Sequence, residues 1–238
     1  MDHIKNLKLV ITAGASGIGA EMAHTLSGAG AKVIICDKDQ AALDQFSKKN
    51  PEVIALKTDV SDEKEVLSLF EEIKTNFGDI NALINNAGVA GPSGKLEDTA
   101  FEDWQNTLNV NLNGTFLCSK AAIPLLKSAG GGSIINIGST SSFMGTPLRS
   151  SYSATKWGLI GLTKTWAMEY GKDNIRINTI CPSSVNGERI EQVIKREAKY
   201  RDTTPEKIKA AYLSQTSLKS FIDAEEIVGM IVYLLSPL

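Results

Sequence analysis

The sequence predicts an α/β fold, one doubly wound parallel sheet with helices on both faces. Apolar strand-like runs alternate with helical patterns along all 238 residues, and such alternation is typical of parallel sheets. The runs are continuously apolar, as expected for strands that are buried on both sides. No internal repeat, low-complexity tract or proline-rich linker divides the chain, so we expect a single domain over residues 1–238.

The elements follow from the apolar periodicity, taken in order. Six apolar runs are predicted to be the strands, at residues 7–12, 32–36, 53–57, 80–84, 134–137 and 175–180. Helical patterns are predicted between and after them, at residues 17–28, 39–48, 102–126 and 152–170, with further helices after the third strand and near the carboxyl end. Ser61 is predicted to cap the helix after the third strand, with Asp62 and Glu63 in its first turn, where acidic groups suit the helix dipole.

Composition excludes several classes of function. The 25 basic and 27 acidic residues give a net charge of −2, which argues against a nucleic-acid partner. No apolar run reaches membrane-spanning length, and the first residues lack the apolar stretch of a signal peptide, so no membrane partner and a cytoplasmic location are expected. Three unpaired, widely spaced cysteines suit a reducing compartment. The two histidines cannot form a usual zinc site, and no metal is expected.

A glycine-rich turn follows the first predicted strand. Its sequence is Thr-Ala-Gly-Ala-Ser-Gly-Ile-Gly over residues 12–19, and a helix starts within it. Glycines there let the backbone approach a pyrophosphate, and the helix amino end offers N–H donors and a positive dipole end. The turn therefore predicts a dinucleotide site, with the candidate contacts Gly14, Ser16, Gly17, Ile18 and Gly19.

Acidic residues end the second and third strands. Asp37 lies eighteen residues after Gly19, where a carboxylate can accept hydrogen bonds from the adenosine ribose and would repel the 2′-phosphate of NADP. We therefore expect the cofactor to be NAD. The alternative for Asp37, and for Asp39, is a helix cap. Asp59, followed by Val60, can meet the adenine or can simply belong to the cap turn near Ser61.

Tyr152 and Lys156 are four residues apart on a predicted helix and therefore share one face. An ammonium beside a phenol favours the phenolate, so the pKa of the tyrosine falls and the side chain can exchange a proton near neutrality. Ser139 ends the apolar run of the fifth strand, thirteen residues upstream. Alone, a tyrosine and a lysine at this spacing are more often an exposed helix face than a site.

In order along the chain, these motifs resemble the short-chain dehydrogenase/reductase family, which has a Rossmann-like fold. The likeness covers nearly the whole sequence. Besides the glycine turn, it is carried by Asn85-Asn86-Ala87-Gly88, Asn111, Ser139, Tyr152, Lys156, Arg176-Ile177-Asn178 and Pro182.

The resemblance implies a role for each matching residue. Tyr152 would be the general acid or base, Lys156 would lower its pKa and bind the nicotinamide ribose, and Ser139 would hydrogen-bond the reacting oxygen. Asn111 would hold a water molecule of a proton relay. The remaining cofactor contacts implied by the family are Asn86, Ala87, Gly88, Pro182 and Val185.

The sequence departs from the family pattern at three places. Ala13 stands where the family usually has glycine, so a negative φ is expected there. Gly187 stands where the family often has a threonine that binds the carboxamide, so Ser184 or the backbone would have to replace it. The family normally continues into a seventh strand, whereas this sequence stops at Leu238, so we expect six strands with an exposed edge on the last.

Residues 183–222, between the sixth strand and the final helix, are expected to cover the substrate, because this region does so in the family. Arg189 is the candidate to hold an anionic or polyhydroxylated substrate, although a solvated amphipathic helix explains most of this segment. Arg149 is better interpreted as a loop arginine that bonds nearby carbonyl groups. Family position adds Ser141, Met144 and Asn186 as candidate pocket residues.

The function expected from the sequence is NAD-dependent interconversion of a secondary alcohol and a ketone. The alternatives are an NADP-linked carbonyl or 3-oxoacyl reductase, which Asp37 disfavours, and a non-catalytic dinucleotide-binding protein. The expected partner is a small-molecule alcohol or ketone. By resemblance we expect a homotetramer, with a dimer as the alternative.

Overall fold

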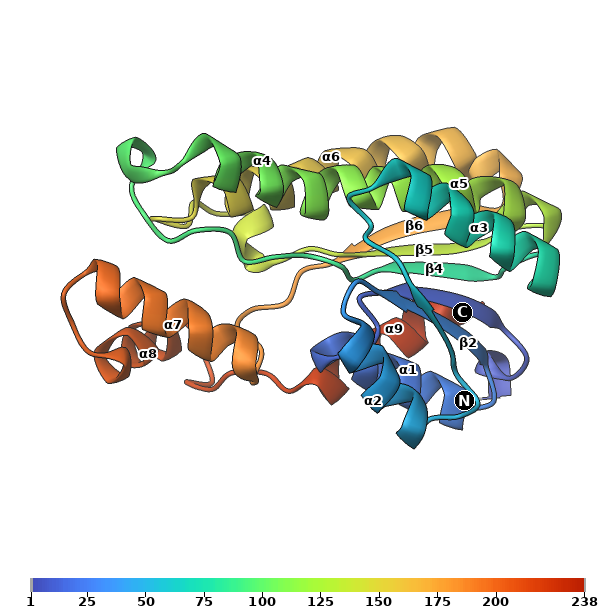
Figure 1. Ribbon diagram of the computed structural model, residues 1–238, viewed down its shortest axis with the longest axis horizontal. Helices are drawn as coiled ribbons and strands as arrows, with labels where there is room; N and C mark the ends of the chain where they lie inside the picture. Colours follow the sequence, from blue (N-terminus) through green and yellow to red (C-terminus); the bar gives the residue numbers. More distant parts are fainter. Residues whose placement is uncertain (1, 238) are drawn as a thin grey trace.

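Six parallel strands form one sheet in the computed structural model, which describes residues 2–237 (Figure 1). Their order across the sheet is β3-β2-β1-β4-β5-β6. The strands are β1 (Lys8–Thr12), β2 (Lys32–Asp37), β3 (Ile54–Lys57), β4 (Ala82–Asn85), β5 (Gly132–Ile137) and β6 (Ile175–Ile180). The order reverses between β1 and β4, which makes the carboxyl ends of these strands the place where such sheets bind ligands. The α/β fold and the sixth strand at the sheet edge are confirmed.

Helices cover both faces of the sheet, with α1, α2 and α9 on one side and α3 to α6 on the other (Figure 1). The helices are α1 (Gly17–Gly28), α2 (Gln40–Lys49), α3 (Glu63–Phe77), α4 (Phe101–Leu108), α5 (Gly114–Ser128), α6 (Ser150–Tyr170), α7 (Glu188–Tyr200), α8 (Pro205–Ser214) and α9 (Ala224–Leu235). Short 3-10 turns are η1 (Asp2–Ile4), η2 (Leu96–Asp98), η4 (Thr140–Ser142) and η5 (Gly171–Asp173).

The strands separate two apolar cores, because successive side chains of a strand point to opposite faces. On β1, Leu9 and Ile11 pack toward α1 and α9, whereas Val10 packs toward α3 and α5. All three are fully buried. This two-sided burial is the reason that the strands appear in the sequence as continuous apolar runs.

The helix caps differ in one place from those expected. Asp39 caps α2 as anticipated, since its carboxylate accepts the Ala42 N–H at 3.1 Å. Asp62, not Ser61, caps α3: its Oδ1 accepts the N–H groups of Lys64 and Glu65 at 2.8 and 3.1 Å. The prediction of Ser61 was wrong because its hydroxyl donates instead to the preceding Asp59, which leaves the next residue to begin the helix.

The single helix predicted over residues 102–126 is a helical run with an insertion. A π-helical turn, η3 (Asn109–Asn113), joins α4 to α5. A π turn inserts a residue into the α-helical repeat and is frequent at functional sites. Asn111 occupies the middle of this turn and is fully buried.

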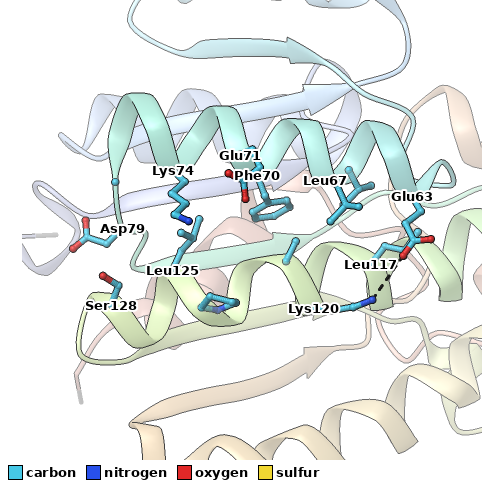
Figure 2. A pocket seen from close by; sticks show the side chains of 14 residues that line it. Glu63, Leu67, Phe70, Glu71, Lys74, Asp79, Leu117, Lys120, Leu125 and Ser128 are labelled. Atoms are coloured by element: carbon cyan, nitrogen blue, oxygen red, sulfur yellow. Dashed lines mark ion pairs between the residues drawn. The ribbon is translucent and has the colours of Figure 1, made fainter.

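A groove runs along the surface between α3 and α5 (Figure 2). It has a volume of about 720 Å³, and Leu67, Phe70 and Leu117 are among its lining residues. Lys120 of α5 and Glu63 of α3 form an ion pair across one end at 3.7 Å. None of the residues predicted for the site lines this groove, so we assign no function to it.

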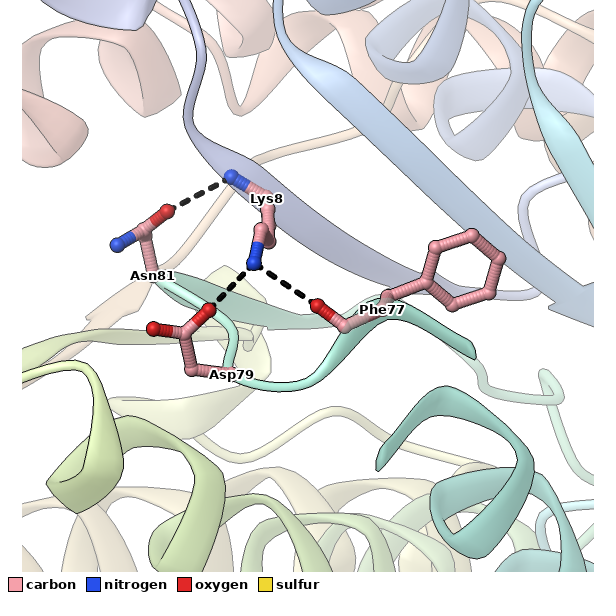
Figure 3. Close-up of polar contacts among 4 residues, drawn as sticks. All are labelled: Lys8, Phe77, Asp79 and Asn81. Atoms are coloured by element: carbon pink, nitrogen blue, oxygen red, sulfur yellow. Dashed lines mark hydrogen bonds and ion pairs between the residues drawn. The ribbon is translucent and has the colours of Figure 1, made fainter. Parts of the chain in front are cut away.

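The amino end of β1 is fastened to the segment between α3 and β4 (Figure 3). Lys8 donates from its ammonium to the Phe77 carbonyl at 2.8 Å and to the Asp79 carboxylate, and its backbone N–H donates to Asn81 at 2.8 Å. The hydrogen bond from Lys8 lowers the pKa of Asp79. These bonds lie at the end of the strand opposite to the glycine turn, so they contribute to placing the strand rather than to the site.

The segment between β6 and α9 forms two helices, α7 and α8, that project beside the sheet (Figure 1). They share a small apolar core of Ile194, Ala198, Ile208 and Phe221, separate from the two cores of the sheet. A single bridge between Val185 and Ile222 closes the base of the segment. Across residues 2–237, no helix has the length and apolar character needed to cross a membrane.

Candidate active site

Tyr152 and Lys156 lie on one face of α6, as predicted. The Lys156 Nζ atom is 5.6 Å from the centroid of the Tyr152 ring. Lys156 is buried, and its ammonium donates a hydrogen bond to the Ile137 carbonyl at 2.6 Å, at the carboxyl end of β5. The helix and the strand therefore fix the lysine relative to the phenol.

The electrostatic surroundings of Tyr152 favour its phenolate. Burial raises the pKa of Tyr152, but the positive charges of Lys156, Arg189 and Arg149 and a hydrogen bond from Ser139 together lower it below its usual value. A tyrosine with a lowered pKa is suited to exchange a proton with an alcohol or ketone oxygen. The same burial lowers the pKa of Lys156, and the Arg189 charge adds to that effect, whereas the nearby Tyr152 opposes it.

Ser139 caps the short turn η4 after β5. Its Oγ accepts the Ser141 N–H at 3.2 Å, and the Ser142 hydroxyl accepts the Ser139 N–H at 3.3 Å. Because the oxygen already accepts one hydrogen bond, its own proton remains for donation toward the Tyr152 oxygen or a substrate oxygen.

Asn111 connects three elements from the π turn. Its Oδ1 accepts the Val89 N–H at 2.7 Å, and its Nδ2 donates to the Val89 carbonyl at 3.0 Å and to Thr155 of α6 at 3.2 Å. The Asn111 side chain thus holds the loop after β4 in place. Its backbone carbonyl accepts the Thr115 hydroxyl at 3.0 Å. The water-holding role implied by resemblance stays a prediction.

Arg149 precedes α6 and is buried against the tyrosine. Its guanidinium carbon is 4.4 Å from the centroid of the Tyr152 ring. Its Nε and Nη2 donate to the Ala90 carbonyl at 3.1 and 2.9 Å. The interpretation as a loop arginine that bonds a nearby carbonyl is confirmed, and the structure adds a cation–π contact with Tyr152.

Asn86 and Thr12 fasten the loop after β4 to the glycine turn. The Thr12 hydroxyl accepts the N–H groups of Asn86 and Ala87 at 3.0 and 2.9 Å. The Asn86 amide donates to the Thr12 and Ala13 carbonyls at 3.1 and 3.0 Å. The Asn-Asn-Ala-Gly motif therefore supports the nucleotide turn directly from the next strand of the sheet.

The geometry of the glycine turn fits a dinucleotide phosphate. Gly17 has φ of 52° with open space beside it, and Gly19 packs so closely that an added Cβ would lie 2.1 Å from the Ala13 carbonyl oxygen. The Ser16 side chain makes no capping hydrogen bond at the start of α1, so it leaves the first N–H groups of the helix available to a phosphate. Gly14 and Ile18 belong to the same turn.

Ala13 does not have the negative φ that was expected. Its φ is 50°, in the left-handed region, and the expectation was wrong. The hydrogen bond from the Asn86 side-chain amide to the Ala13 carbonyl and the close approach of Gly19 hold the backbone in this conformation. An alanine here costs about 1–2 kcal/mol relative to its preferred conformation, which the surrounding contacts offset.

The acidic residues at the sheet edge have different surroundings. Asp37 ends β2, and its carboxylate accepts the Ala15 N–H at 3.3 Å and the Asp39 N–H at 3.1 Å, so it lies directly beside the glycine turn. Asp59 accepts the Ser61 N–H and hydroxyl at 2.9 and 2.6 Å. Burial raises the pKa of Asp59, but these bonds and Lys38 lower it overall. The Val60 side chain packs in the core near Gly114.

The remaining predicted residues surround the carboxyl end of β6 and the turn after β5. The buried Pro182 accepts the Thr140 N–H at 2.9 Å through its carbonyl, and Val185 forms the bridge to Ile222. Ser141 is buried and accepts the Thr146 hydroxyl at 2.8 Å, whereas Met144 is exposed.

Local contacts and backbone conformation account for two residues just before α7, Asn186 and Gly187. The Asn186 amide donates to Asp223, the residue before α9, at 2.6 Å, and this hydrogen bond uses one of its two N–H donors. Gly187 precedes α7 with φ of 135°, where the threonine common in the family would be strained. The backbone conformation at this position therefore explains why the chain has glycine where the family often has threonine.

Two residues near the candidate site, Thr155 and Arg196, were not predicted from the sequence. Thr155 links Asn111 to α6 and also donates to the Tyr152 carbonyl at 2.7 Å, and its place between the tyrosine and the lysine was the available signal. Arg196 lines a cavity of about 540 Å³ together with Arg189, Val89 and Ala90. Its spacing of seven residues from Arg189, one face of a helix, was the signal for it. Among the described residues, no cluster of three or more His, Cys, Asp or Glu side chains is arranged to hold a metal ion.

Comparison with known proteins defines the class. The family model described as short chain dehydrogenase matches residues 8–198. The chain therefore belongs to the short-chain dehydrogenase/reductase family. It is an oxidoreductase of the kind that acts on hydroxyl or carbonyl groups and uses a nicotinamide dinucleotide.

Individual relatives are similar over most of their length. The D-beta-hydroxybutyrate dehydrogenase of Rhizobium meliloti (strain 1021) is 34% identical over 234 residues, which cover 94% of this chain and 90% of that protein. The crystal structure of NAD+-bound xylitol dehydrogenase has a TM-score of 0.93 at 25% identity and covers 98% of this chain and 93% of its own. The crystal structure of a variant of actinorhodin polyketide ketoreductase with NADPH has a TM-score of 0.92 at 26% identity, covering 100% of this chain and 93% of its own.

Proposed function

We propose that the chain catalyses the reversible oxidation of a secondary alcohol to a ketone with NAD. The observation that carries the proposal is the arrangement of Tyr152, whose pKa is lowered by the net effect of its surroundings, between Ser139 and Lys156. A bound nicotinamide dinucleotide supplies the hydride acceptor or donor. The residues of the chain supply the proton chemistry and the positioning.

In the oxidation direction, the Tyr152 phenolate removes the proton from the substrate hydroxyl, and in reduction the phenol returns it. Ser139 donates a hydrogen bond to the reacting oxygen, where negative charge grows as the proton leaves. Lys156 favours the phenolate and is the group that would bind the nicotinamide ribose. Asn111 holds the loop after β4, and we propose that the relay connecting Lys156 to solvent passes near it.

The preference for NAD rests on Asp37. Its carboxylate lies at the glycine turn, where it accepts the Ala15 N–H. A carboxylate there can bind the ribose hydroxyls and repels a 2′-phosphate. The proposed contacts at the phosphates are the N–H groups of the turn, and those farther along are Asp59, Val60, Asn86, Ala87, Gly88, Pro182 and Val185.

Replacement of the proposed acid/base tests the reaction. Tyr152→Phe should reduce kcat by about 10²–10⁴-fold in both directions, because the proton then has no positioned acceptor or donor. Turnover is followed by NADH absorbance over a panel of secondary alcohols that includes 3-hydroxybutyrate and polyols. Tyr170→Phe, at the far end of the same helix, is the matched control and should keep full activity. Equal kcat in wild type and Tyr152→Phe would disprove the assignment.

The cofactor preference is tested separately with the best substrate of that panel. The wild-type kcat/KM should be at least about 10-fold higher with NAD than with NADP, since removal of one unfavourable charge contact of this kind is worth about 1.4 kcal/mol. Asp37→Asn should narrow the ratio by raising activity with NADP. A wild-type preference for NADP would favour the alternative, an NADP-linked carbonyl or 3-oxoacyl reductase.

We also propose that the protein is a homotetramer, with a dimer as the smaller alternative. Phe116 on α5 and Trp157 and Met168 on α6 are large apolar side chains with 44%, 52% and 87% of their surface exposed. Apolar side chains gathered on adjacent helices are typical of a surface that is covered by a second subunit.

A further inference from the structure

A cavity against the loop after β4 has two arginines and one acidic residue among its lining residues. It has a volume of about 540 Å³ and lies between the loop after β4, α4 and α7. The loop contributes backbone and small side chains, and α7 contributes Arg189, Gln192 and Arg196. These three residues recur at spacings of three and four, so one face of α7 turns toward the cavity.

The two arginines have no carboxylate partner in residues 2–237, because no ion pair within 4.0 Å includes either of them. Asp103 of α4 is the one acidic residue among those described that lines the cavity, so the two guanidinium groups leave a net positive lining. Guanidinium groups usually find a planar oxyanion when they converge on a cavity. Neither arginine therefore forms an ion pair with a carboxylate of the described residues.

The arginines also act on one another and on the site. The Arg196 side chain is exposed, but its partial burial lowers its pKa, and the charges of Arg149 and Arg189 lower it further. Arg189 in turn lowers the pKa of Tyr152. The positive end of the cavity thus lies within electrostatic reach of the phenol that would exchange the proton.

The loop that forms one wall of the cavity is rigidly held. Asn111 makes two hydrogen bonds with Val89, and Arg149 makes two with the Ala90 carbonyl. Arg149 is buried and committed to these contacts and to the Tyr152 ring, so it is a positioning residue. Arg189 and Arg196, by contrast, are exposed on α7 and can turn their guanidinium groups toward a ligand.

We propose that Arg189 and Arg196 form an oxyanion-binding subsite, so that the substrate is a secondary alcohol that carries a carboxylate or sulfonate at its other end. The proposal rests on the proposed function for the reacting end of the substrate. The arginines bind the anion and the loop after β4 forms the opposite wall, which directs the hydroxyl toward Tyr152. A neutral alcohol of the same shape lacks this anchor and binds more weakly.

Binding of unreactive probes tests the subsite without turnover. Cyclohexanecarboxylate, cyclohexanesulfonate and the neutral cyclohexanecarboxamide are titrated by calorimetry into the protein, with and without NAD. The anions should bind at least about 10-fold more tightly than the amide, because charge-assisted bidentate hydrogen bonds are lost with the amide. Stronger binding of one anion than the other identifies whether the site prefers carboxylate or sulfonate.

Matched variants assign the binding to the two arginines. Arg189→Gln and Arg196→Gln should each weaken anion binding by about 10-fold and leave the amide affinity unchanged. Lys195→Gln, an exposed cation of the same helix that does not line the cavity, is the control and should bind as wild type does. Thermal unfolding of each variant confirms that it is folded.

The outcomes separate the two proposals. Equal affinity for anion and amide, or unchanged anion binding in both arginine variants, overturns the subsite even if secondary alcohols are oxidised. Selective anion binding that depends on the arginines supports the subsite, and failure of every alcohol with NAD and NADP would then overturn only the proposed reaction.

Discussion

Three cations act on the phenol of Tyr152, and each is placed differently. Lys156 is fixed by the Ile137 carbonyl, Arg149 stacks on the ring, and the charge of the exposed Arg189 acts from α7. Their combined charge, with the Ser139 hydrogen bond, outweighs the burial that would otherwise keep the phenol protonated. The acidity of a single side chain thus depends on residues from separate parts of the chain.

The pH dependence of oxidation should report this arrangement. Activity requires the phenolate, so kcat/KM for a neutral secondary alcohol should rise with pH and level off above the pKa of Tyr152, which lies below its usual value of 10.0. Arg189 lowers that pKa, so Arg189→Gln should move the rise to higher pH. The profile is measured from initial rates at constant ionic strength.

The charged groups that face the phenol are Lys156, Arg189 and Arg149, so a shift in Arg189→Gln has a defined source. Lys195→Gln, on the same helix, should leave the profile in place. A shift of the Arg189→Gln profile to lower pH would contradict the electrostatic account.

Single residues differed in how far the sequence could predict them. Tyr152, Lys156 and Ser139 were found because their chemistry depends on local spacing along one helix and one strand end. The left-handed Ala13 was not, because its conformation is imposed by Asn86, 73 residues away in the chain. Arg196 was missed since a charged residue on an amphipathic helix resembles an ordinary solvated face.

A buried ladder of polar side chains links elements across the sheet. Asn85 of β4 donates to Asn136 of β5 at 2.8 Å, and Asn136 donates to Thr163 of α6 at 2.8 Å. Thr163 in turn pairs with Thr179 of β6 at 2.6 Å. Hydrogen bonds between buried polar side chains favour one arrangement of the elements that carry them, here the strands and the helix that position Tyr152 and Lys156, although the Asn85 Oδ1 atom of this ladder has no partner among the described residues.

Removing one member of the ladder should destabilise the fold. Thr163→Val keeps the shape of the side chain but leaves the Asn136 amide and the Thr179 hydroxyl without their shared partner. The free energy of unfolding should fall by about 1–3 kcal/mol, the cost of unsatisfied buried polar groups. Urea unfolding followed by circular dichroism measures this, and Thr165→Val, exposed on the same helix, should change it little. A loss as small as that of Thr165→Val would show that the ladder adds nothing to stability.

The π turn between α4 and α5 could not be predicted from the periodicity of apolar residues. The sequence over residues 102–126 has a helical pattern, and helical structure is what the chain forms there. The extra residue at Asn109–Asn113 depends on contacts of Asn111 with Val89 and Thr155, which lie on other elements. Ser61 was likewise a plausible helix cap from the sequence, because its hydrogen bond to Asp59 depends on the local backbone conformation.

For the whole molecule, the sheet and its two layers of helices followed from the alternation of apolar runs with helical patterns. The strand order β3-β2-β1-β4-β5-β6 did not follow, because periodicity identifies a strand without identifying its neighbours in the sheet. The division of residues 183–222 into α7 and α8 was also not predicted, because the apolar residues of these helices form a small core of their own and do not pack on the sheet.

We expect four chains to associate in solution. Light scattering should give four times the 25.6 kDa of one chain. Trp157→Glu with Met168→Glu should reduce the mass, because two charges would be buried without partners in the proposed contact. Leu218→Glu, an apolar residue that is 88% exposed elsewhere, is the control and should leave the mass unchanged. A wild-type monomer would rule out the proposed assembly.

The separate core of α7 and α8 has a consequence for how far this segment depends on the sheet. Ile194, Ala198, Ile208 and Phe221 stabilise the two helices against each other, and a single bridge closes the base of the segment. Outside this core, the Tyr200 hydroxyl donates to Asp98 and accepts the Lys95 N–H at 3.2 Å, so the end of α7 is also joined to the segment before α4. We expect that the sequence of such a segment can change while the sheet, the glycine turn and Tyr152 keep their places.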